Sequence, residues 1–198
     1  TDLNNHTIQR HLADATECVI EGELNHLDKN RNIKLTKVEY LHIIGAKTAK
    51  LFSLSSQLGT LMATDDHEAC TRMAEYGHHL GVVFQIIDDC LDYQKPSQKL
   101  GKNTGQDLQE GKPTLPLILA YQYAKPEDQQ RIEELFLHPN TTVADLQPYL
   151  DNTQALQKSM QEAHTAAELA RDALQHLQAS AYKSSLEQLI TFALQRAF

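Results

Sequence analysis

The sequence has 198 residues, of which 41% are hydrophobic and 22% charged, an ordinary composition for one well-packed globular domain. Its formal net charge of −8 argues against non-specific binding to nucleic acid and against electrostatic attachment to anionic lipid. No apolar run reaches the roughly 18 residues that a transmembrane helix needs. The three cysteines form no CxxC pair, so we expect reduced thiols and a cytoplasmic location.

Helical periodicity dominates the chain, because apolar residues recur three and four apart and strand signals are almost absent. Thr36, with Glu39 three residues later, predicts a capping box at the start of one helix. The stretch 93–104 is rich in Lys, Gly, Pro and Ser and is expected to be a loop. We therefore predict a single all-helical domain over residues 1–198, with helices at 7–27, 36–62, 64–92, 114–124, 126–137, 153–177 and 183–197 and a short segment at 142–150.

A pair of aspartates near the end of the third predicted helix is the first candidate for a functional site. In the segment 81–92, GVVFQIIDDCLD, Asp88 and Asp92 are one turn apart and share a narrow arc with Gln85. Most of their neighbours are apolar, and an exposed acidic helix face would not require apolar neighbours. Carboxylates in such a setting are costly unless a cation meets them. We predict that Asp88 and Asp92 bind a metal, and their oxygen ligands suit Mg²⁺.

Two other polar residues of this helix have open interpretations. Asp89 points about 100° away from Asp88, so it is a weaker metal ligand or an acceptor behind the ligands. Gln85 lies one turn before Asp88, where its amide can either contact a phosphate oxygen or pack between helices.

The following segment, GKNTGQDLQEGKPTLP at 101–116, combines lysines with glycines. Lys102 and Lys112 alone would be ordinary solvated lysines. Glycines let backbone N–H groups approach an anion, so the combination predicts a phosphate-binding loop. Asp107, between the lysines, is either a turn-forming residue or a metal ligand through water. Lys47 and Thr48 form a further candidate pair, because they lie amid apolar residues in the middle of a predicted helix.

These segments together resemble the trans-polyprenyl diphosphate synthase family. FQIIDDCLD is similar to the second aspartate-rich motif of that family, and GKNTGQDLQEGKPTLPLI to the loop that follows it. KTAKLF at 47–52 and EGEL at 21–24 resemble two more of its segments. The resemblance extends from about residue 8 to the C-terminus and points to the long-chain members, octaprenyl diphosphate synthases among them. It implies an all-α helical bundle of the isoprenoid-synthase type.

The resemblance also implies a reaction and roles for the candidate residues. Family members use Mg²⁺ to join isopentenyl diphosphate to an allylic diphosphate and are usually homodimers. By this resemblance, Lys47 and Lys102 hold the allylic diphosphate with Thr48 beside them, and Asp107 binds metal through water. The family's first DDxxD motif and an upstream basic GK…R segment do not occur in these residues. Since Thr1 is not an initiator methionine and no signal peptide opens the chain, we expect these residues to begin inside a longer polypeptide. Because the upstream motifs are missing from them, we also expect these residues to be inactive alone.

Several other features have a plainer interpretation. Cys90 is expected to be a packing residue, and Glu17 and Glu21 to be structural, near a subunit contact. Arg196 is expected to be a surface residue, although it could reach the second substrate's diphosphate. The histidines show no zinc-binding spacing. A non-catalytic subunit of a heteromeric synthase is the alternative function, but such a subunit would be expected to lose its metal ligands.

Overall fold

The computed structural model describes residues 5–94 and 105–196, and all regular structure in these two ranges is helical. The predicted all-α class is therefore confirmed, whereas a single domain over the whole chain stays a prediction. The helices are α1 (His6–Asp28), α2 (Lys37–Ile44), the π-helical segment η1 (Gly45–Ala49), α3 (Lys50–Leu61), α4 (His67–Asp92), α5 (Gln106–Gln109), α6 (Leu115–Tyr123), α7 (Pro126–Leu137), α8 (Val143–Thr153), α9 (Ala155–Ala173) and α10 (Ala181–Gln195).

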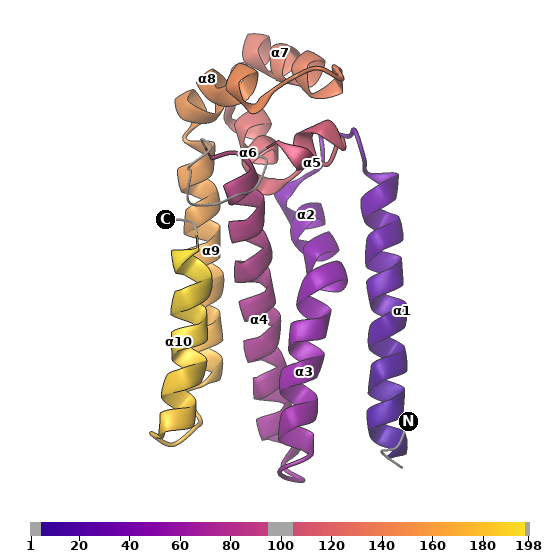
Figure 1. Ribbon diagram of the computed structural model, residues 1–198, viewed down its shortest axis with the longest axis vertical. Coiled ribbons are helices and arrows are strands. Elements are labelled where there is room, and N and C mark those ends of the chain that lie inside the picture. Colours follow the sequence, from indigo (N-terminus) through magenta and orange to yellow (C-terminus); the bar gives the residue numbers. More distant parts are fainter. Residues whose placement is uncertain (1–4, 95–104, 197–198) are drawn as a thin grey trace.

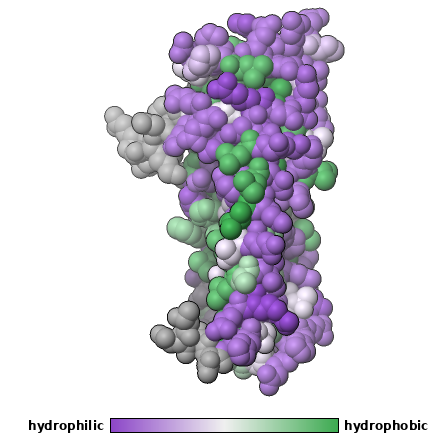
Figure 2. Space-filling model, turned by 90° about the vertical axis from the view of Figure 1, so that its right-hand side faces the viewer, coloured by the Kyte–Doolittle hydropathy of each residue, from purple (hydrophilic) through white to green (hydrophobic). Residues whose placement is uncertain are grey.

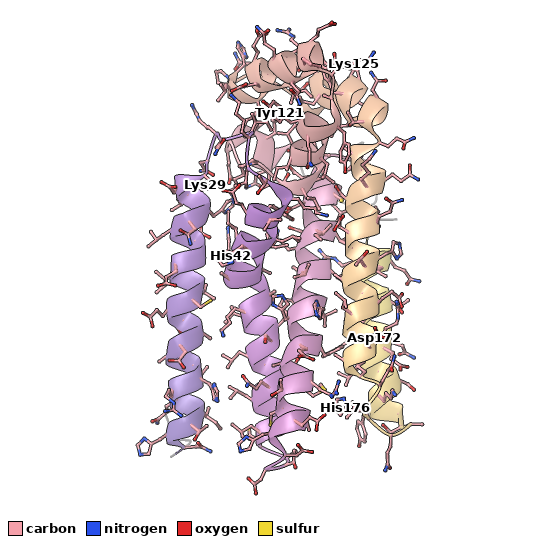
Figure 3. All side chains as sticks on the ribbon, turned by 180° about the vertical axis from the view of Figure 1, so that it is seen from behind. Lys29, His42, Tyr121, Lys125, Asp172 and His176 are labelled. Carbon is pink, nitrogen blue, oxygen red and sulfur yellow. The ribbon has the colours of Figure 1, made fainter. Side chains whose placement is uncertain are left out.

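The long helices lie side by side along the long axis of the molecule. Figure 1 shows α1, the α2–η1–α3 segment, α4, α9 and α10 as an elongated bundle, with α5 to α8 gathered at one end. Lys125, just before α7, lies at that end, and His176, just after α9, lies at the opposite end (Figure 3). The helices at 7–27, 114–124 and 126–137 begin and end within a residue or two of the predicted bounds.

Helix α4 is the central element, and it packs most extensively against α3 and α9. Small residues make both contacts close. On the α3 side, an added Cβ at Gly77 would lie 2.3 Å from the Phe52 carbonyl oxygen, and one at Gly81 would lie 2.6 Å from Ala49 Cα. On the other side, the buried residues of α9 are mostly alanines. Cys90 is 1% exposed within this core, as expected for a packing residue.

The predicted capping box at the start of α2 is present. Glu39 Oε2 accepts from the Thr36 backbone N–H at 2.9 Å, and Thr36 Oγ1 accepts from the Glu39 N–H at 3.2 Å. These bonds satisfy N–H groups that the first helical turn leaves without an intrahelical partner.

The helix predicted at 36–62 is not uniform. Its middle, η1, is a π-helical segment that begins at Gly45 and contains Lys47 and Thr48. Such segments interrupt the regular side-chain spacing and often occur at functional sites. Helix α1 approaches η1 closely through Gly22, where an added Cβ would lie 2.7 Å from the Lys47 backbone nitrogen. This interruption is not predictable from the sequence, because no residue pattern distinguishes a π turn from an α turn.

The outer face of α1 exposes a row of apolar side chains. Figure 2 looks onto the side of the molecule that carries α1 and shows apolar residues running along it. The side chains of this row are between 47% and 60% exposed: Leu12, Ile20, Leu24 and Leu27. Within the described residues, no helix combines the length and the apolar character needed to span a bilayer.

Candidate functional site

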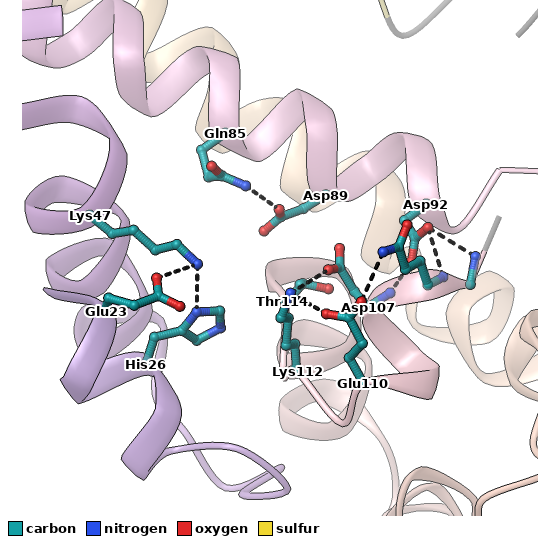
Figure 4. Close-up of polar contacts among 12 residues, drawn as sticks. Glu23, His26, Lys47, Gln85, Asp89, Asp92, Asp107, Glu110, Lys112 and Thr114 are labelled. Atoms are coloured by element: carbon teal, nitrogen blue, oxygen red, sulfur yellow. Dashed lines mark hydrogen bonds and ion pairs between the residues drawn. The ribbon is translucent and has the colours of Figure 1, made fainter. Parts of the chain in front are cut away.

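A cavity of about 190 Å³ lies between α1, the α2–η1 segment, the end of α4 and the connection from α5 to α6. It brings together lysines and carboxylates that are far apart in the sequence. Its charged and polar lining includes Lys47, Lys112, Asp88, Asp89 and Asp107. Figure 4 shows these elements facing one another across the site. The remaining lining residues are His26, Leu35, Tyr40, Ile43, Ile44, Gln85, Pro113 and Thr114.

Lys47 reaches this cavity from η1 and is held there by α1. Its Nζ forms an ion pair with Glu23 Oε2 at 2.8 Å and lies 3.0 Å from His26 Nδ1 (Figure 4). The hydrogen bond with Lys47 lowers the pKa of Glu23, and burial, followed by the Lys47 charge, lowers the pKa of His26. A neutral His26 therefore accepts a hydrogen bond from the Lys47 ammonium group at Nδ1, which leaves Nε2 as the nitrogen that carries the ring hydrogen.

Asp88 lines the cavity with a side chain that is 36% exposed. Its Oδ1 lies 3.4 Å from Arg196 Nη2, and the Arg196 guanidinium stacks over the Phe84 ring with Cζ 4.5 Å from the centroid. The prediction of Arg196 as a surface residue was wrong, because α10 folds back along α4 and brings it to Asp88. Asp88 therefore already has a cationic neighbour, the Arg196 guanidinium.

Asp89, rather than Asp88, is the buried carboxylate of the motif, with 3% of its surface exposed. Its Oδ2 accepts from the Tyr40 hydroxyl at 2.6 Å and its Oδ1 from Gln85 Nε2 at 2.7 Å. Burial raises the pKa of Asp89 from 3.8 to about 7, although these two hydrogen bonds oppose the shift. Asp89 therefore accepts two hydrogen bonds within the core, and its predicted place behind the metal ligands stays a prediction.

This pKa has a consequence for stability. In the folded chain Asp89 holds its proton up to about pH 7, whereas in the unfolded chain it loses the proton near its ordinary value of 3.8. Between these pH values the folded state therefore binds more protons than the unfolded state. The contribution of Asp89 to the free energy of unfolding is thus fully present below about pH 3.8 and is lost as the pH rises through about 7. We expect Asp89→Asn, which cannot ionise, to show a shallower fall in unfolding free energy over this window in urea titrations.

Asp65→Asn, at an exposed aspartate before α4, is the matched control and should keep the pH dependence of the natural chain. If the unfolding free energy falls equally steeply with pH for the natural chain and for Asp89→Asn, the raised pKa of Asp89 is contradicted.

Asp92 is not among the residues that line the cavity, and it anchors the start of α5. Its Oδ1 accepts from the backbone N–H groups of Gly105 and Gln106 at 2.9 and 3.1 Å, and its Oδ2 from that of Asp107 at 3.0 Å. Gly105 adopts a left-handed φ of 84° at this turn. The observed contacts of Asp92 thus position the loop that carries Asp107. Its predicted role as a metal ligand stays a prediction.

Asp107 and Lys112 enter the cavity from this loop. Lys112 Nζ lies 3.8 Å from Asp107 Oδ1 and pairs more closely with Glu110. Burial, followed by repulsion from Asp92, raises the pKa of Asp107 to about 6. The helix α5 was not predicted, because Asp92, thirteen residues before Gly105, supplies its cap. Lys102, predicted to bind diphosphate, lies outside the described residues.

Thr48 and Gln85 are joined to each other. Thr48 Oγ1 lies 2.8 Å from Gln85 Oε1, and the Gln85 amide in turn reaches Asp89. Gln85 lines the cavity, as its position one turn before Asp88 suggested. The side chains from η1 and α4 therefore form one connected set.

The charges of the site suit a divalent cation. Lys47 pairs with Glu23, Lys112 pairs with Glu110 and more distantly with Asp107, and Arg196 lies beside Asp88. With the buried Asp89 included, these carboxylates outnumber these three cations. In residues 5–94 and 105–196, no three carboxylate, imidazole or thiolate side chains form a ready-made metal cage. Mg²⁺ does not need one, because it commonly binds one or two carboxylates together with waters and substrate phosphates. Asp88 and Asp107 fit that mode of binding.

Sequence reasoning missed three lining or supporting residues. No role was predicted for Glu23 or Tyr40, and His26 was considered only among the histidines, which show no zinc-binding spacing. A signal existed for two of them, because Glu23 lies inside the EGEL segment and His26 one turn later on the same helix. Nothing in the sequence indicated that Tyr40 faces Asp89 across the core.

Comparison with known proteins decides the family. Residues 1–153 match the family described as polyprenyl synthetase. The chain belongs to the polyprenyl synthetase family. This confirms the resemblance drawn from the aspartate motif and the following loop.

Named relatives of the polyprenyl synthetase family support the fold. Octaprenyl diphosphate synthase of Escherichia coli K12 is 35% identical over 99% of this chain and 61% of its own length. The crystal structure of a polyprenyl synthase from Caulobacter crescentus CB15, in complex with calcium and isoprenyl diphosphate, superposes with a TM-score of 0.90 at 34% identity, over 98% of this chain and 60% of that one. The crystal structure of a decaprenyl diphosphate synthase from Rhodobacter capsulatus superposes with a TM-score of 0.90 at 30% identity, over 100% of this chain and 62% of that one. The chain thus spans about three fifths of the length of these relatives.

Proposed function

We propose that this chain forms part of the active site of an Mg²⁺-dependent trans-polyprenyl diphosphate synthase. The reaction is the head-to-tail condensation of isopentenyl diphosphate with an allylic diphosphate, which gives an all-trans product longer by one five-carbon unit. The observation that carries the proposal is the cavity in which Lys47 and Lys112 face Asp88 and Asp107. The E. coli relative is named for such an activity, and the Caulobacter structure holds calcium and isoprenyl diphosphate.

The roles of the charged residues follow from their chemistry. Asp88 and Asp107 are the carboxylates that would hold Mg²⁺ here. Once held, the ion would neutralise the allylic diphosphate and so favour ionisation of its C–O bond. Asp92 already accepts from three backbone N–H groups, so about one of its roughly four lone-pair sites remains for a ligand. Its larger contribution is to fix the loop.

The cationic side chains share the negative charge of the diphosphate. We assign this role to Lys47, Lys102 and Lys112, together with the free amide hydrogen of Gln85. The Glu23 and His26 contacts of Lys47 occupy two of its three N–H donors, which leaves one donor for a phosphate oxygen. A lysine held in this way loses little conformational entropy when the ligand binds.

The apolar part of the cavity protects the reaction. Leu35, Ile43 and Ile44 line it beside the charged groups and would keep water from the allylic cation. The alkene of isopentenyl diphosphate attacks this cation, and the released pyrophosphate accepts the proton that is then lost. The carboxylates hold cations in this scheme and need not act as general bases.

The direct experiment is an elongation assay with labelled isopentenyl diphosphate and an allylic primer. We expect no sustained turnover by the 198 residues alone, because an upstream DDxxD motif is not among them. A chimaera that places the N-terminal two fifths of the E. coli relative before this chain should elongate the primer in the presence of Mg²⁺. Robust turnover by the chain alone would refute the half-site hypothesis.

The same chimaera distinguishes an enzyme from a non-catalytic subunit. A folded chimaera that gives no product, and whose diphosphate binding is unchanged by Lys47→Ala, would favour the non-catalytic alternative.

We also include in the proposal a cytoplasmic homodimer, with the exposed apolar row of α1 (Leu12, Ile20, Leu24 and Leu27) as its expected contact.

A further inference from the structure

The imidazole of His26 has a second nitrogen, Nε2, to which the roles assigned above give no part. His26 lies in the last turn of α1, is half-buried and lines the cavity beside Lys47 and Lys112. Its Nδ1 lies 3.0 Å from Lys47 Nζ. Figure 4 shows the ring between Lys47 and the loop that carries Lys112 and Glu110. The position of this side chain therefore suits contact with a ligand in the cavity.

Lys47 fixes the position of the hydrogen on this ring. An ammonium group has three N–H donors and no acceptor, so Nδ1 must accept from Lys47 and cannot carry a hydrogen itself. The hydrogen of the neutral ring is therefore on Nε2. Turning the ring over would place the carbon atom Cδ2 beside Lys47 Nζ and lose the hydrogen bond, so the same contact fixes the ring orientation. Burial, followed by the Lys47 charge, lowers the pKa of His26 and so favours the neutral ring.

The Nε2–H group has no acceptor in the part of the protein that the structure describes. Within residues 5–94 and 105–196, the side-chain hydrogen bond of His26 is made by Nδ1. Nε2 is also not one of the enclosed polar side-chain atoms that lack a partner there, so solvent reaches it. Since His26 lines the cavity, this donor can meet a ligand that enters it.

We propose that His26 binds the diphosphate through Nε2–H, which donates to a phosphate oxygen beside the ammonium group of Lys47. Hydrogen bonds in a chain polarise one another, so the cation at Nδ1 makes Nε2–H a stronger donor than that of an isolated neutral imidazole. His26 thus carries part of the positive charge of Lys47 across the ring to the ligand. This inference rests on the proposed function, because it adds a binding residue to the same diphosphate site.

Substitution can separate two roles of His26. A residue that only held Lys47 in place would need the acceptor at Nδ1, whereas a binding residue also needs the donor at Nε2. The amide of asparagine lies near the position of Nδ1, and the amide of the longer glutamine reaches the position of Nε2. His26→Asn therefore keeps an acceptor for Lys47 but has no donor at the outer position, where His26→Gln places an NH₂ group. His26→Leu has neither group.

The first measurement is the affinity for pyrophosphate with Mg²⁺, by titration calorimetry. We expect His26→Leu and His26→Asn to weaken binding at least about tenfold, the usual effect of losing a hydrogen bond to a charged group, and His26→Gln to stay within about threefold. His164→Asn, at an exposed histidine of α9, is the matched control and should stay within about twofold of the natural chain, because it removes no contact of the site. The inference is overturned if His26→Asn binds like the natural chain, or if His26→Gln loses as much affinity as His26→Leu.

The second measurement observes the ring in the natural chain, so it does not depend on the folding of any variant. Long-range proton–nitrogen NMR spectra distinguish the two neutral forms of histidine. His26 should show the form with hydrogen on Nε2, and its Nε2 signal should shift when Mg²⁺ and pyrophosphate are added. A ring hydrogen on Nδ1, or an Nε2 signal that saturating pyrophosphate leaves in place, would overturn the inference.

The proposed function is tested separately by Lys47→Ala. If this variant binds pyrophosphate at least about tenfold more weakly while His26→Asn binds normally, only the inference about His26 fails. If the natural chain does not bind pyrophosphate with Mg²⁺, or Lys47→Ala binds it as tightly as the natural chain, the proposed function fails and the inference falls with it.

Discussion

Replacing Asp88 with asparagine should remove most of the Mg²⁺-dependent binding of pyrophosphate. Of the two motif carboxylates that line the cavity, Asp88 is the more exposed, and it lies beside a cationic group, Arg196. Asparagine keeps the shape and one oxygen but loses the negative charge that a divalent cation requires. We expect the dissociation constant, measured by calorimetry with Mg²⁺ present, to rise at least about tenfold, equivalent to ~1.4 kcal/mol.

Glu75→Gln is the matched control. It removes one negative charge from an exposed position of the same helix, so it tests whether net charge alone changes the affinity. Binding should stay within about twofold of the natural chain, because an exposed charge at this distance is largely screened by salt. A result in which Asp88→Asn and Glu75→Gln behave alike would contradict the assignment of Asp88 to the metal.

Adding a methyl group at Gly81 should destabilise the whole bundle. Its Cβ would lie 2.6 Å from Ala49 Cα, a backbone atom of the η1 segment. The contact between α4 and the α2–η1–α3 segment must then open, because neither backbone can move aside alone. We expect Gly81→Ala to lower the unfolding free energy by about 3 kcal/mol, toward the upper end of overpacking effects, in urea titrations.

The control substitution is Gly59→Ala in α3. No atom lies within 4 Å of the Cβ that it would add, and alanine is the better helix former, so a gain of about 0.5–1 kcal/mol is expected. Gly81→Ala should in addition weaken pyrophosphate binding, since η1 positions Lys47. Unfolding curves that shift in the same direction for both variants would show that the α3–α4 contact is looser than described.

The fold was predictable because it depends on patterns that are local in sequence. Apolar periodicity gave the helices, and the Thr36–Glu39 pair gave a helix start that the structure confirms. The exceptions have non-local causes. Helix α5 is capped by Asp92 from the end of α4, and η1 is a π turn that packs against Gly22 of α1.

The site was predictable in its residue types but not in their orientation. A rotation of 100° separates Asp88 from Asp89, and both flanks of α4 are apolar, so the sequence could not show which of the two is buried. Burial of Asp89 depends on Tyr40, and the setting of Lys47 depends on Glu23 and His26. These contacts join helices whose relative positions only the three-dimensional structure defines.

The most direct test of the account is paramagnetic broadening of amide resonances by Mn²⁺ in the presence of pyrophosphate. The ion should take the place of Mg²⁺ in the cavity and broaden first the signals of Asp88, Asp107 and Lys112. The acidic first turn of α7, at Glu127 and Asp128, should keep sharp signals. Broadening at α7 with the cavity residues unaffected would contradict a metal–diphosphate site between η1 and the end of α4.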